Sequence, residues 1–404
     1  MRYLPNGKQM SEADAHTIHE IGIPSLVLME RAALQIVETM HKKNISTEKS
    51  LIVCGSGNNG GDGFAVARLL TEQGKHADVL FAGKEASLSE ECRCQKQIVE
   101  NMGISVFTEF PDEEYTVIID AVFGVGLCRE ITGHYKDVID WMNLQDAEKV
   151  AVDIPSGICA ATGKILGTAF RADLTVCMAC VKLGCELFPG KSYAGESIPV
   201  AIGIDPKYFS NRLDVCYTFD KNDLGKLLPS RMMNSHKGSY GKVLMITGSP
   251  GMAGAAFLSA CAAYTVGAGL VQTASENRLA LQELLPEAII SCYDSYDDSQ
   301  LSHLLDWADV VCIGCGLGMG QISEKILKNV LKNVSCPCVI DADGLNLLSR
   351  NIELLNQCCA PVILTPHMKE MSRLTGWSID TIMEDRFQAL DQIINNPDRI
   401  QNHP

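Results

Sequence analysis

The stretch LIVCGSGNNGGDG, residues 51–63, joins an apolar run to a turn that contains five glycines. The apolar half predicts a buried β-strand, and residues 64–73 predict the helix that follows. Glycines remove Cβ atoms from such a turn, so backbone N–H groups can approach a phosphate at the helix N-terminus. A strand, a glycine turn and a helix in this order indicate a layered α/β domain.

Strand-like apolar runs recur on both sides of this stretch, with helical segments between most of them. In the first half of the chain these runs are residues 50–54, 77–82, 117–121, 150–154 and 174–180. A second series follows at residues 242–247, 269–273, 309–314, 337–341 and 361–365. The alternation is typical of a largely parallel sheet with helices on its faces. Because a polar stretch with prolines separates the two series, we expect two α/β domains, residues 1–218 and 224–404.

The composition of the chain limits its class and its partners. The 404 residues are 46% hydrophobic and 21% charged, as in a globular protein with a substantial core, and their formal net charge is -15. Such a charge disfavours nucleic acid and anionic membranes, and no apolar run reaches the ~18 residues that span a bilayer. The 17 cysteines lie mostly in apolar runs, where we expect nearly all to be buried thiols in a reducing compartment. We therefore expect a cytoplasmic enzyme or binding protein.

Acidic residues end two further strands of the first series. Asp120 stands in VIIDAVFGVGL and Asp153 in VAVDIPSG. Since the carboxyl ends of parallel strands share one edge of a sheet, we expect Asn59, Asp120, Asp153 and Ser156 to converge there. A single aspartate at a strand end more often caps a helix, but three polar strand ends flanked by glycine favour a site. Lys182 follows the next strand, where it would neutralise a phosphate, assist proton transfer or lie solvated on the surface.

The glycine turn leaves two other functions open. Gly55, Gly57 and Gly60 match the G-x-G-x-x-G pattern of NAD(P)-dependent oxidoreductases. The acid nearest the end of the next strand, Glu85, comes late and beside a lysine, which is a poor match for a ribose-binding acid. Two asparagines and an aspartate in the turn favour cation or hydroxyl binding instead. A non-catalytic nucleotide-binding or interaction module is the other alternative.

Four motifs of the first half resemble those of a known family. The segments GSGNNGGDG, DAVFGVGL, VDIPSG and VKLG are similar, in order and spacing, to the epimerase domain of bifunctional NAD(P)H-hydrate repair enzymes, over about residues 1–218. The resemblance implies a Rossmann-like three-layer α/β/α fold and interconversion of the R and S forms of hydrated NADH or NADPH. It also implies a potassium ion held by Asn59, Asp120 and Ser156, and it favours a homo-oligomer.

The resemblance further implies substrate contacts from the glycine turn, from the loop after the Asp120 strand and from Asp153. The implied contacts are Asn58, Asn59, Gly60, Gly61, Asp62, Gly124, Val125, Gly126, Leu127, Cys128, Arg129, Glu130 and Tyr135, and we expect Lys182 beside them. Epimerisation at C6 of the hydrated ring passes through a cationic, iminium-like species or through ring opening. An ionised Asp153 is therefore the expected catalytic residue, which stabilises the charge and carries a proton.

A second set of motifs resembles the ADP-dependent dehydratase domain of the same enzymes, which has a ribokinase-like fold. The segments are KGSYGKVLMITGS, GMAGAA, GCGLG, DADGLN and LTPHMKE, within about residues 224–376. The resemblance implies that Ala255, Gly318 and His367 contact the hydrated nucleotide, with Asp343 close to them.

The sequence departs from this family after Gly376. The family continues to a Gly-Thr-Gly-Asp-like turn that binds the ADP phosphate and carries the catalytic aspartate, and this sequence contains no such turn. We therefore expect a C-terminally truncated chain whose ribokinase-like domain is incomplete. Without an ADP site, it is expected to lack ADP-dependent dehydratase activity.

Overall fold

The computed structural model describes residues 1–228, 230–293 and 297–394. The chain folds into two compact units, Met1–Leu228 and Pro229–Pro404. The division therefore falls after Leu228, a few residues beyond the segment 219–223 at which we expected it. In the described part of the chain, no helix has the length and apolar character needed to cross a membrane.

The first unit is built on a seven-stranded parallel sheet in the order β4-β3-β2-β5-β6-β7-β8. Its strands are β2 (Lys49–Cys54), β3 (His76–Phe81), β4 (Val106–Phe107), β5 (Val117–Ala121), β6 (Glu148–Val152), β7 (Leu174–Met178) and β8 (Glu196–Val200). A separate antiparallel pair joins β1 (Arg2–Leu4) to β9 (Cys216–Thr218). The strand order reverses between β2 and β5, which is where an open α/β sheet forms a crevice for ligands.

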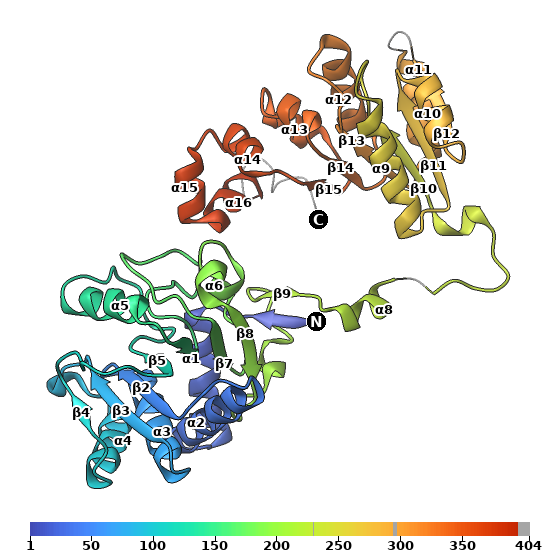
Figure 1. The fold of residues 1–404 in the computed structure, drawn as a ribbon. Coiled ribbons are helices and arrows are strands. Elements are labelled where there is room, and N and C mark those ends of the chain that lie inside the picture. The colour runs from blue at the N-terminus through green and yellow to red at the C-terminus, as the bar shows by residue number, and fades with distance from the viewer. Residues whose placement is uncertain (229, 294–296, 395–404) are drawn as a thin grey trace. The chain divides into compact units, whose positions relative to one another are not determined.

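Helices cover both faces of this sheet (Figure 1). They are α1 (Gly7–His16), η1 (Thr17–Ile21), α2 (Ser25–Lys42), α3 (Asn58–Glu72), η2 (Glu85–Ser87), α4 (Glu90–Asn101), α5 (His134–Leu144), α6 (Leu183–Glu186), α7 (Lys191–Ala194), η3 (Pro206–Phe209), η4 (Lys221–Asp223) and α8 (Leu224–Leu227). Alternate residues of β2 point to opposite faces. Ile52 and Cys54 belong to the core formed with α2, α3 and α4, whereas Leu51 and Val53 belong to the core formed with α5. The expected Rossmann-like three-layer α/β/α fold is thus confirmed.

The second unit contains a six-stranded parallel sheet in the order β12-β11-β10-β13-β14-β15. Its strands are β10 (Lys242–Ile246), β11 (Leu270–Ser275), β12 (Ile289–Cys292), β13 (Val310–Ile313), β14 (Cys338–Ile340) and β15 (Val362–Leu364). Its helices are η5 (Lys237–Tyr240), α9 (Ala253–Val266), α10 (Arg278–Leu284), α11 (Asp298–Trp307), α12 (Gln321–Asn333), α13 (Asp343–Leu348), η6 (Ile352–Gln357), α14 (Met368–Thr375), α15 (Ile379–Glu384) and α16 (Arg386–Ile394). The larger core packs α11 to α16 against the sheet, and a smaller core packs α9 against β10 and β11. The expected parallel α/β architecture is confirmed here too.

Three strands and one helix start differ from the expectation. β4 has only two residues, β8 carries Glu196 and Pro199, and β12 is partly exposed, so none of them forms a continuous apolar run. α3 begins at Asn58, six residues before the expected start at Phe64, because the second half of the glycine turn is itself helical.

The expectation that nearly all cysteines are buried is wrong, since seven of the 17 are buried and the others lie at partly or fully exposed positions such as Cys94.

Candidate functional site

The glycine turn is fitted closely against the end of β5. A Cβ at Gly55 would lie 2.1 Å from the carbonyl oxygen of Val122, and a Cβ at Gly60 would lie 2.0 Å from that of Gly55. A Cβ at Gly61 would lie 2.6 Å from the Met29 side chain of α2. A side chain does not fit at Gly55 or Gly60, where the near atoms are backbone, whereas at Gly61 the flexible Met29 side chain would have to move. The absence of side chains therefore brings the N-terminus of α3 up to the loop that follows β5.

Asp120 lies in β5, in a fully buried network of hydrogen bonds. Its carboxylate accepts hydrogen bonds from the Ser156 N–H at 2.7 Å, from the Ser156 hydroxyl at 2.6 Å and from the Val122 N–H at 3.2 Å. The Ser156 hydroxyl also accepts a hydrogen bond from the Phe123 N–H at 2.8 Å. Burial raises the pKa of Asp120 to about 6, against the lowering effect of the hydrogen bonds. A buried carboxylate and a hydroxyl are thus fixed side by side.

Asn59 approaches the same loop from α3. A Cβ at Gly124 would lie 3.3 Å from the Asn59 Cβ and 3.6 Å from its Oδ1. The Asn59 Nδ2 atom is buried and has no hydrogen-bond partner within the described residues. Because the oxygen and nitrogen of an amide are assigned from their partners, turning the amide would place Oδ1 where Nδ2 now lies. Asn59, Asp120 and Ser156 therefore offer the oxygen groups that a hard cation prefers, beside an unsatisfied buried atom.

Asp153, in the loop after β6, combines an unusual backbone conformation with two donors. Its φ of 70° lies in the left-handed region, which is sparsely populated for residues other than glycine and is common at functional sites. Its Oδ1 accepts a hydrogen bond from the Met178 N–H at 2.8 Å and forms an ion pair with the Lys182 ammonium. Lys182 is fully buried and also donates to the Met178 carbonyl at 3.0 Å. The expectation that Lys182 meets a substrate phosphate is corrected, because its ammonium is enclosed and contacts Asp153.

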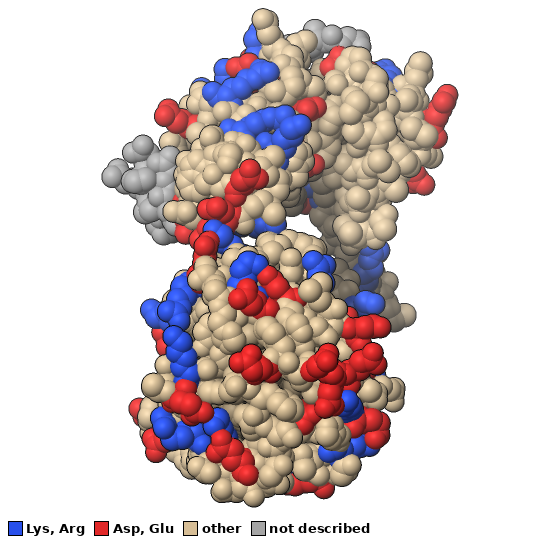
Figure 2. All heavy atoms as spheres, turned by 60° about the vertical axis from the view of Figure 1, so that its left-hand side comes forward, with Lys and Arg blue, Asp and Glu red and all other residues tan. Residues whose placement is uncertain are grey.

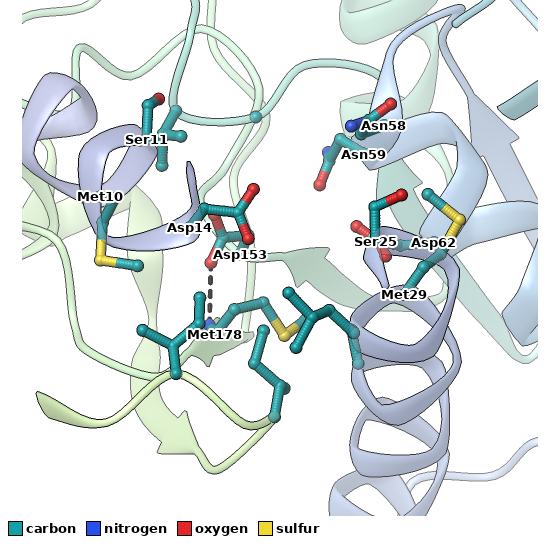
Figure 3. Close-up of a pocket in the computed structure, with 16 residues that line it drawn as sticks. Met10, Ser11, Asp14, Ser25, Met29, Asn58, Asn59, Asp62, Asp153 and Met178 are labelled. Carbon is teal, nitrogen blue, oxygen red and sulfur yellow. Dashed lines mark hydrogen bonds between the residues drawn. The ribbon is translucent and has the colours of Figure 1, made fainter. Parts of the chain in front are cut away.

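A pocket at this edge of the sheet brings together carboxylates from three segments. Figure 3 shows Asp14 of α1 beside Asp153 on one side and Asp62 of α3 on the other, near Ser25 and Met29 of α2. Burial, and then the charge of Asp153, raises the pKa of Asp14 and, more strongly, that of Asp62. The full lining is Met10, Ser11, Asp14, Ser25, Leu28, Met29, Ala32, Asn58, Asn59, Asp62, Gly124, Val125, Asp153, Met178, Ile202 and Ile204.

The wall that α1 and α2 contribute to this pocket is not expected from the sequence. Ser11 and Asp14 stand three residues apart on one face of α1, which is the only local signal that they act together. Their place at the ligand-binding edge of the sheet depends on how the N-terminal helices pack, and that packing has no signature in the spacing.

The expected contacts of the first unit divide into three groups. Asn58, Asn59, Asp62, Gly124, Val125 and Asp153 line the pocket, whereas Gly60 and Gly61 pack inside the turn. The rest of the loop, namely Gly126, Leu127, Cys128, Arg129 and Glu130, lies outside the lining, and its last three residues are exposed. Tyr135 packs against Phe123 with ring centroids 4.8 Å apart and is also outside the lining. The structure thus does not bring the outer loop and Tyr135 to this pocket.

In the second unit, three of the four expected contacts meet where the glycine loops follow β10 and β13. A Cβ at Gly316 would lie 2.7 Å from that of Ala255, and the Gly318 N–H donates to the Asp343 carboxylate at 2.9 Å. His367 has no recorded contact with these residues. Its side chain is 64% exposed and caps α14 after β15, the strand next to β14.

Comparison with known proteins bears on both units. Residues 25–184 match the family profile described as the YjeF-related protein N-terminus, and residues 243–400 match that of the NAD(P)H-hydrate dehydratase. The chain is 34% identical over 414 residues to a bifunctional NAD(P)H-hydrate repair enzyme of Moorella thermoacetica, an alignment that covers 96% of this chain and 77% of the relative. This chain belongs to the family of bifunctional NAD(P)H-hydrate repair enzymes. The resemblance of both sets of motifs is thereby confirmed.

Another member of the repair-enzyme family, from Coxiella burnetii, is 34% identical over 395 residues, which cover 97% of this chain and 80% of the relative. Among solved structures, the ADP/ATP-dependent NAD(P)H-hydrate dehydratase of Bacillus subtilis is 30% identical, and the alignment covers 41% of this chain and 58% of that chain with a TM-score of 0.35.

Proposed function

We propose that the pocket of the first unit interconverts the R and S forms of hydrated NADH or NADPH, with Asp153 as the catalytic residue. The relatives of this chain are repair enzymes by name, which supports this assignment. The observation that carries it is the Asp153 carboxylate, held by two donors and facing a pocket at the ligand-binding edge of a parallel sheet.

Inversion at C6 creates positive charge on the hydrated ring, and Asp153 is suited to stabilise it. The Met178 N–H and the Lys182 ammonium both reach Oδ1, so Oδ2 remains for the substrate. A carboxylate that is already oriented needs little reorganisation when the charge develops. Met10, Leu28 and other apolar residues of the lining would exclude water around the ring.

The cation in this proposal is K+, held by Asn59, Asp120 and Ser156. When bound, it would offset the charge of the buried Asp120 carboxylate and give the amide of Asn59 a partner. A ligand that binds only the folded state raises its stability. We therefore expect a higher thermal midpoint in KCl than in LiCl at equal ionic strength, and we expect Asn59→Ala to abolish the difference. Equal midpoints of the wild type in the two salts would contradict the site.

For the second unit we propose a hydrate-binding role for Ala255, Gly318 and Asp343, with His367 contributing from the neighbouring strand end. After Gly376 the sequence contains no glycine, and so no Gly-Thr-Gly-Asp turn for an ADP phosphate. We accordingly propose that these 404 residues alone do not carry out ADP-dependent dehydration, although their relatives are bifunctional by name.

We further propose small nucleotides as the partners of this protein, rather than nucleic acid or membrane, and a homo-oligomer acting in the cytoplasm. The net charge of -15 supports the choice of partner. On the face of the first unit in Figure 2, acidic side chains are interspersed with basic ones. Support for the oligomer comes from the family resemblance.

The experiment that tests the proposed function follows pure (R)-NADH hydrate by proton NMR in the presence of the purified chain. We expect the S form to appear faster than in the protein-free sample, until the mixture reaches its equilibrium ratio. Transfer of hydride from ordinary alcohol or hydroxy-acid substrates to NAD(P), with no R/S exchange, would favour an oxidoreductase. Binding of the hydrate without either reaction would favour a non-catalytic module.

A further inference from the structure

Besides Asp153, the pocket holds carboxylates that have no role in the proposed function. Asp62 lies in α3 and lines the pocket together with Asp153. In the part of the chain that the structure describes, no hydrogen bond and no ion pair to the Asp62 carboxylate is recorded. Asp153 differs, because it accepts the Met178 N–H and pairs with the Lys182 ammonium. Asp14, the third carboxylate of the pocket, also lacks a donor among the described residues, but it lies beside Asp153, whereas Asp62 stands across the pocket (Figure 3).

We propose that Asp62 is a second catalytic residue, which gives its proton to the departing C6 hydroxyl of the hydrate from the side of the ring opposite to Asp153. This inference rests on the proposed epimerase function.

The charges around Asp62 favour its neutral form. The carboxylates of Asp153 and Asp14 lie near Asp62 and repel a negative charge on it. Lys182 is the nearby cation, and its ammonium is already paired with Asp153. The thiols of Cys92 from α4 and Cys54 from β2 also interact electrostatically with Asp62. Burial and the two acids raise the pKa of Asp62 well above its usual range. Two carboxyl groups whose surroundings separate their protonation states are a recurrent arrangement for acid and base catalysis.

The placement of the two carboxylates matches the stereochemical task. Figure 3 shows Asp62 across the pocket from Asp153 and Asp14, on the wall formed by α2 and α3. When C6 becomes planar, its hydroxyl must leave from one face and water must add to the other. A carboxyl group on each wall can serve one face each, which a single carboxylate cannot do without reorienting the ring.

The step proceeds without redox change. Asp62 transfers its proton to the C6 hydroxyl, the C6–O bond breaks, and its electron pair leaves with the oxygen as water. The lone pair on N1 forms the N1=C6 bond of an iminium ion, which the Asp153 carboxylate stabilises. A water molecule then adds to C6 from the opposite face and gives a proton to Asp153. Asp153 releases this proton to solvent and Asp62 takes one up from solvent, which restores both groups. The reverse inversion uses the two groups in exchanged roles.

The path of the oxygen atom tests this step in the wild-type protein. In water labelled with oxygen-18, C–O cleavage introduces one labelled oxygen at C6 for each inversion, whereas ring opening retains the original oxygen. Mass spectrometry of newly formed S hydrate, corrected for exchange without protein, is expected to show label in every inverted molecule. Inversion without label would overturn the role of Asp62 and leave the epimerase function standing.

The variant Asp62→Asn tests the residue itself, because its amide keeps the shape of the carboxyl group but cannot donate a proton. We expect its kcat for R/S exchange to fall by about 100-fold or more, with hydrate affinity changed by less than about threefold. Glu72→Gln, an exposed change on the same helix, is the control and should match the wild type. Rates for Asp62→Asn equal to the wild type would overturn the inference alone. Absence of exchange by the wild type would overturn the proposed function as well.

Discussion

Lys182 and Asp153 form an ion pair at a depth where an isolated charge is unfavourable. The Lys182 side chain is 0% exposed and that of Asp153 is 14% exposed. A buried ammonium requires a partner, and Asp153 and the Met178 carbonyl are the partners recorded for it. The pair therefore links the stability of the first unit to the orientation of its proposed catalytic carboxylate.

Replacing Lys182 is expected to destabilise the protein strongly. Lys182→Met removes the ammonium and leaves Asp153 with the Met178 N–H alone, so we expect the free energy of unfolding in urea to fall by about 3–5 kcal/mol. Lys136→Met is the matched control, because Lys136 forms an exposed pair with Asp140 along α5, where solvent screens the charges and the expected loss is much smaller. Equal losses in the two variants would contradict the structural role assigned to Lys182.

The sequence predicts those site residues that end strands. Asp120 and Asp153 directly follow apolar runs, and Ser156 stands three residues after Asp153. The carboxyl ends of parallel strands share one edge of the sheet, and there Asp120 and Ser156 are hydrogen-bonded. Asp14 and the burial of Lys182 are not predictable in this way, because both depend on which segments pack over that edge.

At the scale of elements, the glycine turn determines where α3 begins. Gly55 and Gly60 lie so close to neighbouring backbone that a methyl group at either position would displace the turn. Asn58 and Asn59 are the first two residues of α3, and Asp62 follows in the same helix four residues after Asn58. The close approach of the turn to the end of β5 thus positions three of the residues that line the pocket.

Gly60→Ala is expected to lower the free energy of unfolding by about 1–3 kcal/mol, since its Cβ would lie 2.0 Å from the Gly55 carbonyl oxygen. Gly126→Ala in the loop after β5 is the control, because a Cβ there meets no atom within 4 Å. Urea unfolding of both variants measures the difference. A Gly60→Ala protein as stable as Gly126→Ala would show that the turn is not closely packed.

The elements that the sequence predicts best are the central strands of both sheets. β2, β5, β7 and β13 are flanked by strands on both sides and read as apolar runs. β4 and β12 lie at sheet edges, and β8 carries polar residues and a proline. The sequence therefore does not predict these strands, which are identified only by their pairing with a neighbouring strand.

At the scale of the whole molecule, the chain joins two α/β units of one repair-enzyme family. Both parallel sheets place glycine loops and acids at their ligand-binding edges, although the two edges carry different residues. The first unit has a pocket with three carboxylates, whereas the second unit brings together Ala255, Gly318 and Asp343.

The second unit yields a prediction about the purified chain of 404 residues. With (S)-NADH hydrate and ADP, we expect no formation of NADH above the protein-free rate, because the sequence provides no Gly-Thr-Gly-Asp turn for the ADP phosphate. Absorbance of NADH at its near-ultraviolet maximum gives the rate, and a family dehydratase in the same assay is the positive control. ADP-dependent production of NADH by this chain would refute the prediction.

The central claim is that Asp153 performs epimerisation in the pocket of the first unit. The most direct measurement is the rate of R/S exchange of NADH hydrate for the wild type, Asp153→Asn and Asp112→Asn, the last being an exposed carboxylate outside the pocket. We predict that Asp153→Asn loses exchange by at least about 100-fold while it still binds the hydrate, and that Asp112→Asn matches the wild type. Equal exchange rates for Asp153→Asn and the wild type would contradict the account.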